Sequence, residues 1–181
     1  MRAGLSEVRM RRKILAALFW SAYGLLAGVL IWHSCRTGES SVGDSSAVGE
    51  WLEPFFSGLI PDPTGAGRPI DVWWSGYGAF IRKGIGHFGG FGALGAFGGA
   101  AFALSFFRGG AKKPYLSALR AFAFCLAAGL FLGALTEGLQ LFSEGRNGSF
   151  SDVALDFSGY AVGAAASYFL TIFILSKRKG R

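Results

Sequence analysis

The sequence predicts an all-α integral membrane protein, a bundle of four transmembrane helices with both chain termini in the cytoplasm. Three observations lead to this prediction: an apolar composition, four long stretches nearly free of charge, and cations gathered at one end of those stretches. Of the 181 residues, 51% are hydrophobic and only 16% are charged. A chain of this length suits one domain, and this composition is too apolar for an ordinary soluble one.

Four apolar stretches are long enough, with their flanks, to cross a bilayer as helices. They lie at residues 14–31, 84–107, 121–135 and 153–175. A helix needs roughly 18 or more apolar residues to span the hydrocarbon core. The third stretch is shorter, but Arg120 can extend its guanidinium to the interface, which lengthens the usable span from Leu116 to beyond Glu137.

The positions of the cations predict the orientation. Thirteen of the 18 Lys and Arg residues fall on one side of the four spans: Arg2, Arg9, Arg11, Arg12, Lys13, Arg108, Lys112, Lys113, Arg120, Lys177, Arg178, Lys179 and Arg181. Cytoplasmic loops carry an excess of Lys and Arg, so we expect both termini inside and residues 34–80 and 138–152 outside. The cations flank apolar spans, so the net charge of +7 does not indicate a nucleic-acid partner.

The chain divides into a basic cytoplasmic head at residues 1–13, a single four-helix membrane domain at 14–175 with an outer loop at 34–80, and a basic cytoplasmic tail at 176–181. A basic head before an apolar run is also the pattern of a secretory signal peptide. The run from Ile14 exceeds the 7 to 15 residues of a signal core, and no small-residue cleavage site follows it. We therefore expect an uncleaved first helix.

The outer loop changes character along its length. After the polar run TGESSVGDSS, Trp51, Phe55 and Leu59 recur at four-residue spacing. This stripe indicates either a short helix in the lipid headgroup region, kinked or begun at Pro54, or a loop with a few apolar anchors. The aromatic cluster at residues 73–77 is typical of an interfacial belt before the second span.

Glycines recur four residues apart in each of the last three spans. The pairs are Gly86 and Gly90, Gly95 and Gly99, Gly129 and Gly133, and Gly159 and Gly163. Small residues at this spacing let helices approach closely, so we interpret them as packing faces, with substrate grooves as the alternative. They are not phosphate loops, because they lie within apolar helices and no strand precedes them.

The two cysteines are not expected to pair. Cys35 falls at the outer edge of the membrane and Cys125 near its middle. The sequence contains no zinc spacing, nucleophile elbow, Walker loop or dinucleotide fingerprint. We therefore expect no cofactor and no metal ion.

Polar side chains gather where the third and fourth apolar stretches meet. Glu137 and Gln140 are three residues apart, so they share one face of a helix. Asp152 and Asp156 are four apart and share a face with glycines further along. The connecting segment SEGRNGS favours turns and contains Arg146, the only cation nearby. Two polar stripes facing each other predict one shared site.

Two blocks of residues flank the last three spans in a recognisable order. The first block contains Arg82, Lys83, His87 and Phe88, and the second contains Glu137, Gln140, Arg146, Ser149, Asp152 and Gly159. Together they resemble the VanZ-like family of small bacterial membrane proteins over roughly residues 80–165. Gly90 and Phe91 stand where many members carry Glu and Tyr, and Asp156 stands where Asn is usual. The resemblance implies a multi-pass protein of the bacterial plasma membrane with a VanZ-like core at 80–175.

The predicted site combines the polar residues of both blocks with one further carboxylate. Its members are Arg82, Lys83, His87, Glu137, Gln140, Arg146, Ser149, Asp152 and Asp156. These residues either pair with one another and hold three helices in register, or line an outward-facing notch where arginines bind an anionic group. His87 could act as a general acid or base oriented by a carboxylate. A metal site at His87, Glu137 and Asp156 is a minor alternative.

VanZ-like proteins are associated with resistance to glycopeptide antibiotics, notably teicoplanin. The resemblance therefore implies an envelope protein that lowers susceptibility to lipid-tailed glycopeptides, although a housekeeping role in the envelope is equally open. Expected partners are membrane lipids, with lipid-linked cell-wall precursors or the drug itself as ligands. The alternative is an intramembrane enzyme that modifies a polyprenyl-phosphate carrier.

Overall fold

The computed structural model describes residues 2–57, 81–107 and 112–177, and over these ranges the chain is helical with no strand. The elements are α1 (Arg2–Ser34), α2 (Gly38–Ser57), the π-helix η1 (Ile81–Gly89), α4 (Gly90–Phe106), α5 (Pro114–Gln140) and α6 (Phe150–Lys177). This confirms the all-α prediction.

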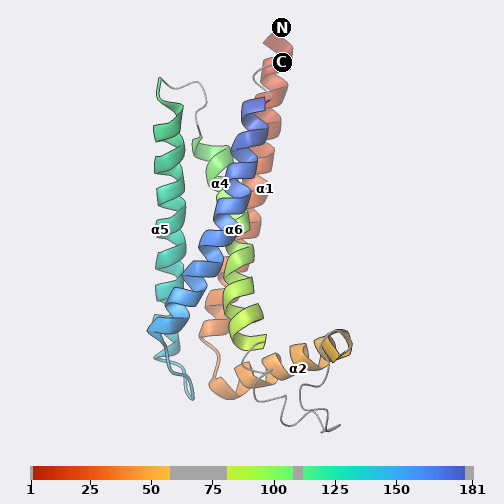
Figure 1. Cartoon of the computed structure of the whole chain (residues 1–181), viewed down its shortest axis with the longest axis vertical. Coiled ribbons are helices and arrows are strands. Elements are labelled where there is room, and N and C mark those ends of the chain that lie inside the picture. The colour runs from red at the N-terminus through yellow and green to blue at the C-terminus, as the bar shows by residue number, and fades with distance from the viewer. Residues whose placement is uncertain (1, 58–80, 108–111, 178–181) are drawn as a thin grey trace.

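Four helical segments are long and apolar enough to cross a membrane. They are Arg9–Ser34, Arg82–Phe106, Pro114–Gln140 and Phe150–Lys177, and each covers nearly all of one predicted stretch. The helices form an elongated bundle in which the start of α1 and the end of α6 lie at the same end (Figure 1). The chain is therefore a multi-pass membrane protein by length and composition, and the side that each end faces stays a prediction.

Helices α4 and α6 pack backbone against backbone through their glycines. A Cβ atom added at Gly95 would collide with the carbonyl of Tyr160, and one at Gly163 would collide with the carbonyl of Gly92. Only glycine leaves room for two helices at this separation. These contacts confirm the packing-face interpretation for Gly95 and Gly163.

The centre of the bundle is filled by Tyr160, which is fully buried. Its ring occupies the space that a side chain at Gly129 would need. Its hydroxyl lies 3.5 Å from Sγ of Cys125, which is buried, whereas Cys35 is exposed. Both cysteines are free, as predicted from their different depths.

The polar run of the expected outer loop forms a helix. Helix α2 begins at Gly38 rather than at Pro54, and the amide of Ser40 donates to Oγ1 of Thr37, an N-terminal cap. The helix lies across the end of the bundle opposite the start of α1 (Figure 1). Trp51 is 78% exposed on it, while Leu59 and the aromatic cluster at 73–77 lie outside the described residues.

Candidate functional site

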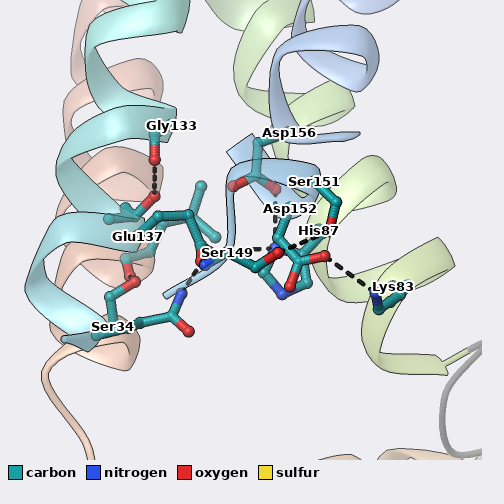
Figure 2. Close-up of polar contacts among 12 residues, drawn as sticks. Ser34, Lys83, His87, Gly133, Glu137, Ser149, Ser151, Asp152 and Asp156 are labelled. Atoms are coloured by element: carbon teal, nitrogen blue, oxygen red, sulfur yellow. Dashed lines mark hydrogen bonds and ion pairs between the residues drawn. The ribbon is translucent and has the colours of Figure 1, made fainter. Parts of the chain in front are cut away.

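Three helices bring an imidazole and two carboxylates together at the end of the bundle that α2 crosses. Nδ1 of His87, on η1, lies 2.9 Å from Oδ1 of Asp156 on α6 and 3.8 Å from Oε1 of Glu137 on α5. Figure 2 shows the three side chains converging from separate ribbons. Asp156 is completely buried and Glu137 is 3% exposed. This arrangement is the innermost part of the site.

His87 reaches this cluster from a π-helix. The wider turn of η1 interrupts the regular periodicity of the second span just before α4 begins at Gly90. Such wide turns inside α-helices often occur at functional sites. Gly159 of α6 packs against the backbone of Phe88, so η1 lies close to the residues that follow Asp156. Close packing of two backbones therefore positions the imidazole beside the carboxylate.

Both oxygens of Glu137 are held by the chain around it. Nε2 of Gln140, one turn later on α5, donates to Oε1. The backbone amide of Ser149 donates to Oε2 over 3.0 Å. Ser149 directly precedes α6, so this bond fixes the start of α6 against the end of α5. The three-residue spacing of Glu137 and Gln140 predicted their shared face, and the structure confirms it.

Asp152 has a different partner from Asp156. Nζ of Lys83 on η1 lies 3.1 Å from Oδ1 of Asp152, at a partly exposed position. Figure 2 shows this pair beside the His87 cluster. The two aspartates are one turn apart on α6, yet one binds a surface lysine and the other a buried imidazole. Lys83 and Asp152 therefore belong to the rim of the site.

Arg146 holds the connection between α5 and α6 against the end of α1. Its NH1 donates to the backbone carbonyl of His33 over 2.9 Å. Burial lowers the pKa of Arg146 from its ordinary value, an effect opposed by the nearby charge of Glu137. The sequence offered Arg146 as a partner for the carboxylates. No carboxylate among the described residues lies within ion-pairing distance of Arg146, so no ion pair neutralises its charge.

A cavity of about 240 Å³ opens between these elements. Its polar lining includes His33, Asp44, Arg82, His87, Glu137, Gln140, Arg146 and Asp156. Its apolar lining includes Val29, Leu30, Val48, Ile85 and Phe91. Of the nine residues predicted for the site, six line this cavity. Ser149 donates to one of them, Glu137, while Lys83 and Asp152 pair with each other at the rim.

Two ionisable lining residues, His33 and Asp44, were not predicted from the sequence. His33 ends the first span, and its Nε2 lies 3.5 Å from Oδ2 of Asp44 on α2. Asp44 also forms an ion pair with Arg36. No spacing along the chain connects these residues to the later spans. They come together at the cavity because α2 packs across the end of the bundle.

The arrangement supports two kinds of chemistry. The arginines and the apolar wall suit an anionic group attached to an apolar body. The atoms of His87, Glu137 and Asp156 all lie within 4.8 Å of one another and could hold a metal ion. Comparison of this chain with protein families, with curated proteins and with solved structures found no match.

Proposed function

We propose that this chain is a VanZ-like protein of the bacterial plasma membrane that binds the anionic group of a membrane amphiphile and thereby lowers susceptibility to lipid-tailed glycopeptides such as teicoplanin. The observation that carries the proposal is the composition of the cavity. Arg82 and Arg146 line one part of it, and apolar side chains that include Leu30 and Ile85 line another. A ligand with a charged head and an apolar body fits both surfaces.

Arginine is well suited to this recognition. The guanidinium carries five N–H donors, so the bond from Arg146 to the His33 carbonyl leaves others for a ligand. Charge-assisted hydrogen bonds to phosphate or carboxylate are short and are strengthened where water is excluded. Arg82 is exposed at the same cavity and adds a second positive charge. The two arginines form the anion-binding part of the proposed site.

The orientation inferred from the cations supports a site on the outer side. Thirteen cations flank the other end of the spans, and Lys and Arg mark the cytoplasmic side. Helix α2 crosses the opposite end of the bundle (Figure 1), and its residues Asp44 and Val48 line the cavity. An amphiphile of the outer leaflet would reach the cavity with its tail in lipid. The acyl tail of teicoplanin gains about 0.8 kcal/mol per buried methylene in that leaflet, and vancomycin lacks such an anchor.

The test is antibiotic susceptibility in a Gram-positive host that expresses the chain. We expect the minimum inhibitory concentration of teicoplanin to rise more than that of vancomycin. Arg146→Ala should abolish the difference, because lost charge-assisted bonds forfeit roughly 1.5 to 3 kcal/mol, about ten- to a hundredfold in affinity. Arg146→Ala also removes the hydrogen bond to the His33 carbonyl. Arg82→Ala removes a positive charge from the cavity and leaves that bond in place.

Arg120→Ala, exposed at the opposite end of the bundle, is the matched control and should leave the difference intact. Protein levels in the membrane are measured beside susceptibility for every variant. Equal shifts for both drugs, or no shift at normal levels of the wild-type protein, would contradict the proposal.

A second function is favoured by one specific contact. Oδ1 of Asp156 lies 2.9 Å from Nδ1 of His87. A carboxylate at this position orients the imidazole so that its other nitrogen can act as a general base or acid. In this alternative the chain is an intramembrane enzyme that modifies a polyprenyl-phosphate carrier. Turnover of a polyprenyl phosphate by the purified protein, lost in His87→Gln, would favour the enzyme over the binding protein.

A further inference from the structure

His87, Glu137 and Asp156 present ligand atoms of the kinds that transition metals bind. The imidazole Nδ1 and one oxygen from each carboxylate lie within 4.8 Å of one another. Each residue comes from a different helix, so the cluster is a product of tertiary packing. Imidazole nitrogen and carboxylate oxygen are both ligand types that Zn²⁺ binds in proteins.

Two of the three separations between these ligand atoms are close to those of a common coordination sphere, and all three are within 4.8 Å. A tetrahedral ion with bonds of about 2.1 Å separates its ligand atoms by roughly 3.4 Å. The distances from Nδ1 of His87 to Asp156 and to Glu137 are 2.9 and 3.8 Å, on either side of that value. Small side-chain adjustments would therefore bring all three atoms onto one ion.

An independent observation comes from the second oxygen of Asp156. The residue is completely buried, and its Oδ2 has no hydrogen-bond partner among the described residues. Buried polar atoms are nearly always satisfied, and an orphaned carboxylate oxygen is costly because it has given up water without gaining a donor. Asp156 also lines the cavity. The unsatisfied oxygen therefore points to a ligand that supplies positive charge there.

The charges around the cluster lead to the same conclusion. Two carboxylates are set against a single imidazole, and no Lys or Arg among the described residues forms an ion pair with Glu137 or Asp156. Lys83 pairs with Asp152, and Arg146 donates to the carbonyl of His33. A divalent cation would compensate the two buried carboxylates directly.

We propose that His87, Glu137 and Asp156 bind a divalent transition-metal ion, with Zn²⁺ preferred, and that the cavity provides its remaining coordination position. Three protein ligands and one open position are the pattern of zinc sites that bind an exogenous ligand. The ion replaces the proton on Nδ1 of His87. Gln140 and the Ser149 amide hold the Glu137 carboxylate in place, as outer partners of metal ligands do. Phosphate or carboxylate oxygens entering the cavity would complete the coordination.

This inference goes beyond the proposed recognition of an amphiphile and is tested without it. The full chain is purified in detergent without a histidine tag, stripped with a chelator and titrated with Zn²⁺ by calorimetry. The wild-type protein should bind one ion per chain. Asp156→Asn and His87→Gln should weaken binding by at least about 100-fold, more than the loss of an outer partner usually costs.

Two controls alter groups outside the proposed ligand set. Glu144→Gln alters an exposed carboxylate of the connection between α5 and α6, and His33→Gln removes the only other histidine of the chain. Both should keep wild-type affinity. Failure of the wild type to bind about one ion, or full binding by Asp156→Asn, would overturn the proposal.

A second measurement is used if Asp156→Asn or His87→Gln fails to fold, as judged by size-exclusion elution. In the His33→Gln protein, His87 is the only imidazole. Pulsed electron paramagnetic resonance of bound Cu²⁺ should then show coupling to one imidazole nitrogen. One equivalent of Cu²⁺ should also displace Zn²⁺ bound beforehand, because nitrogen and oxygen ligands bind Cu²⁺ more tightly than Zn²⁺. A Cu²⁺ signal without imidazole coupling would overturn the assignment to His87.

Discussion

Lys83 and Asp152 form an ion pair of 3.1 Å between the start of the second span and the start of the fourth. The pair lies beside the buried contact of His87 with Asp156, and the Lys83 side chain is 47% exposed. Two carboxylates one turn apart on α6 therefore sit in very different surroundings. Their substitution should have different consequences.

Asp152→Asn should change the free energy of unfolding by less than about 1 kcal/mol, because solvent screens a partly exposed pair. Glu137→Gln should lower it by more, about 1 to 3 kcal/mol, since a buried acceptor of two hydrogen bonds is altered. Thermal unfolding in detergent measures both. A larger loss in Asp152→Asn would contradict this ranking of the two positions.

Gly95→Ala should destabilise the bundle by about 1 to 3 kcal/mol or prevent its assembly, because the added methyl group would collide with the carbonyl of Tyr160. Gly24→Ala on α1 is the control, since nothing lies within 4 Å of its added Cβ. Thermal unfolding and the yield of monodisperse protein measure the difference. Equal stability of the two variants would show that the contact between α4 and α6 is looser than described.

Gly145→Ala should lower stability by about 1 to 2 kcal/mol, because Gly145 has a φ of 70°, which side-chain-bearing residues rarely adopt. This turn also contacts the start of α2, because the amide of Gly38 donates to the Glu144 carbonyl over 2.8 Å. Gly43→Ala, which meets nothing within 4 Å, is the control. Proteolysis of the connection between α5 and α6 in intact protein should be faster in Gly145→Ala than in Gly43→Ala.

Labelling of single cysteines tests the orientation, in a background where Cys35 and Cys125 are replaced. Ser45→Cys on α2 should react with a membrane-impermeant maleimide in intact cells. Lys112→Cys, between α4 and α5, should react only after the membrane is opened, because the excess of cations places that connection inside. The reverse pattern would invert the bundle and remove the outward-facing site with it.

The four spans could be predicted from sequence because burial in lipid depends mainly on the length and composition of a segment. The glycine pairs likewise predicted close packing without showing which helices meet. Helix α2 was not expected from Gly38 onward, because Ser, Gly and Asp are weak helix formers. Its start is held by a tertiary contact that no local pattern shows, the hydrogen bond from the amide of Gly38 to the carbonyl of Glu144.

The site was predictable as a set of residues and not as a set of partners. The spacing of Glu137 and Gln140 placed them on one face, and the structure confirms the hydrogen bond between them. The choice of Lys83 by Asp152, and of His87 by Asp156, depends on the π-helical turn of η1. A wide turn of this kind cannot be inferred from a periodicity of 3.6 residues.

The glycine contacts between α4 and α6 have a consequence for biogenesis. Half of the apolar window of α4 is buried within the bundle, against 6% of that of α1. During synthesis α4 leaves the ribosome before α6, so Gly95 and Gly99, which pack against α6, must first face lipid or the insertion machinery. The glycine face of α4 therefore stays in contact with lipid until α6 is inserted and covers it. The rate of chain elongation sets how long this face is exposed. Synthesis that stalls before α6 would leave an incomplete bundle in the membrane, which quality-control proteases could degrade.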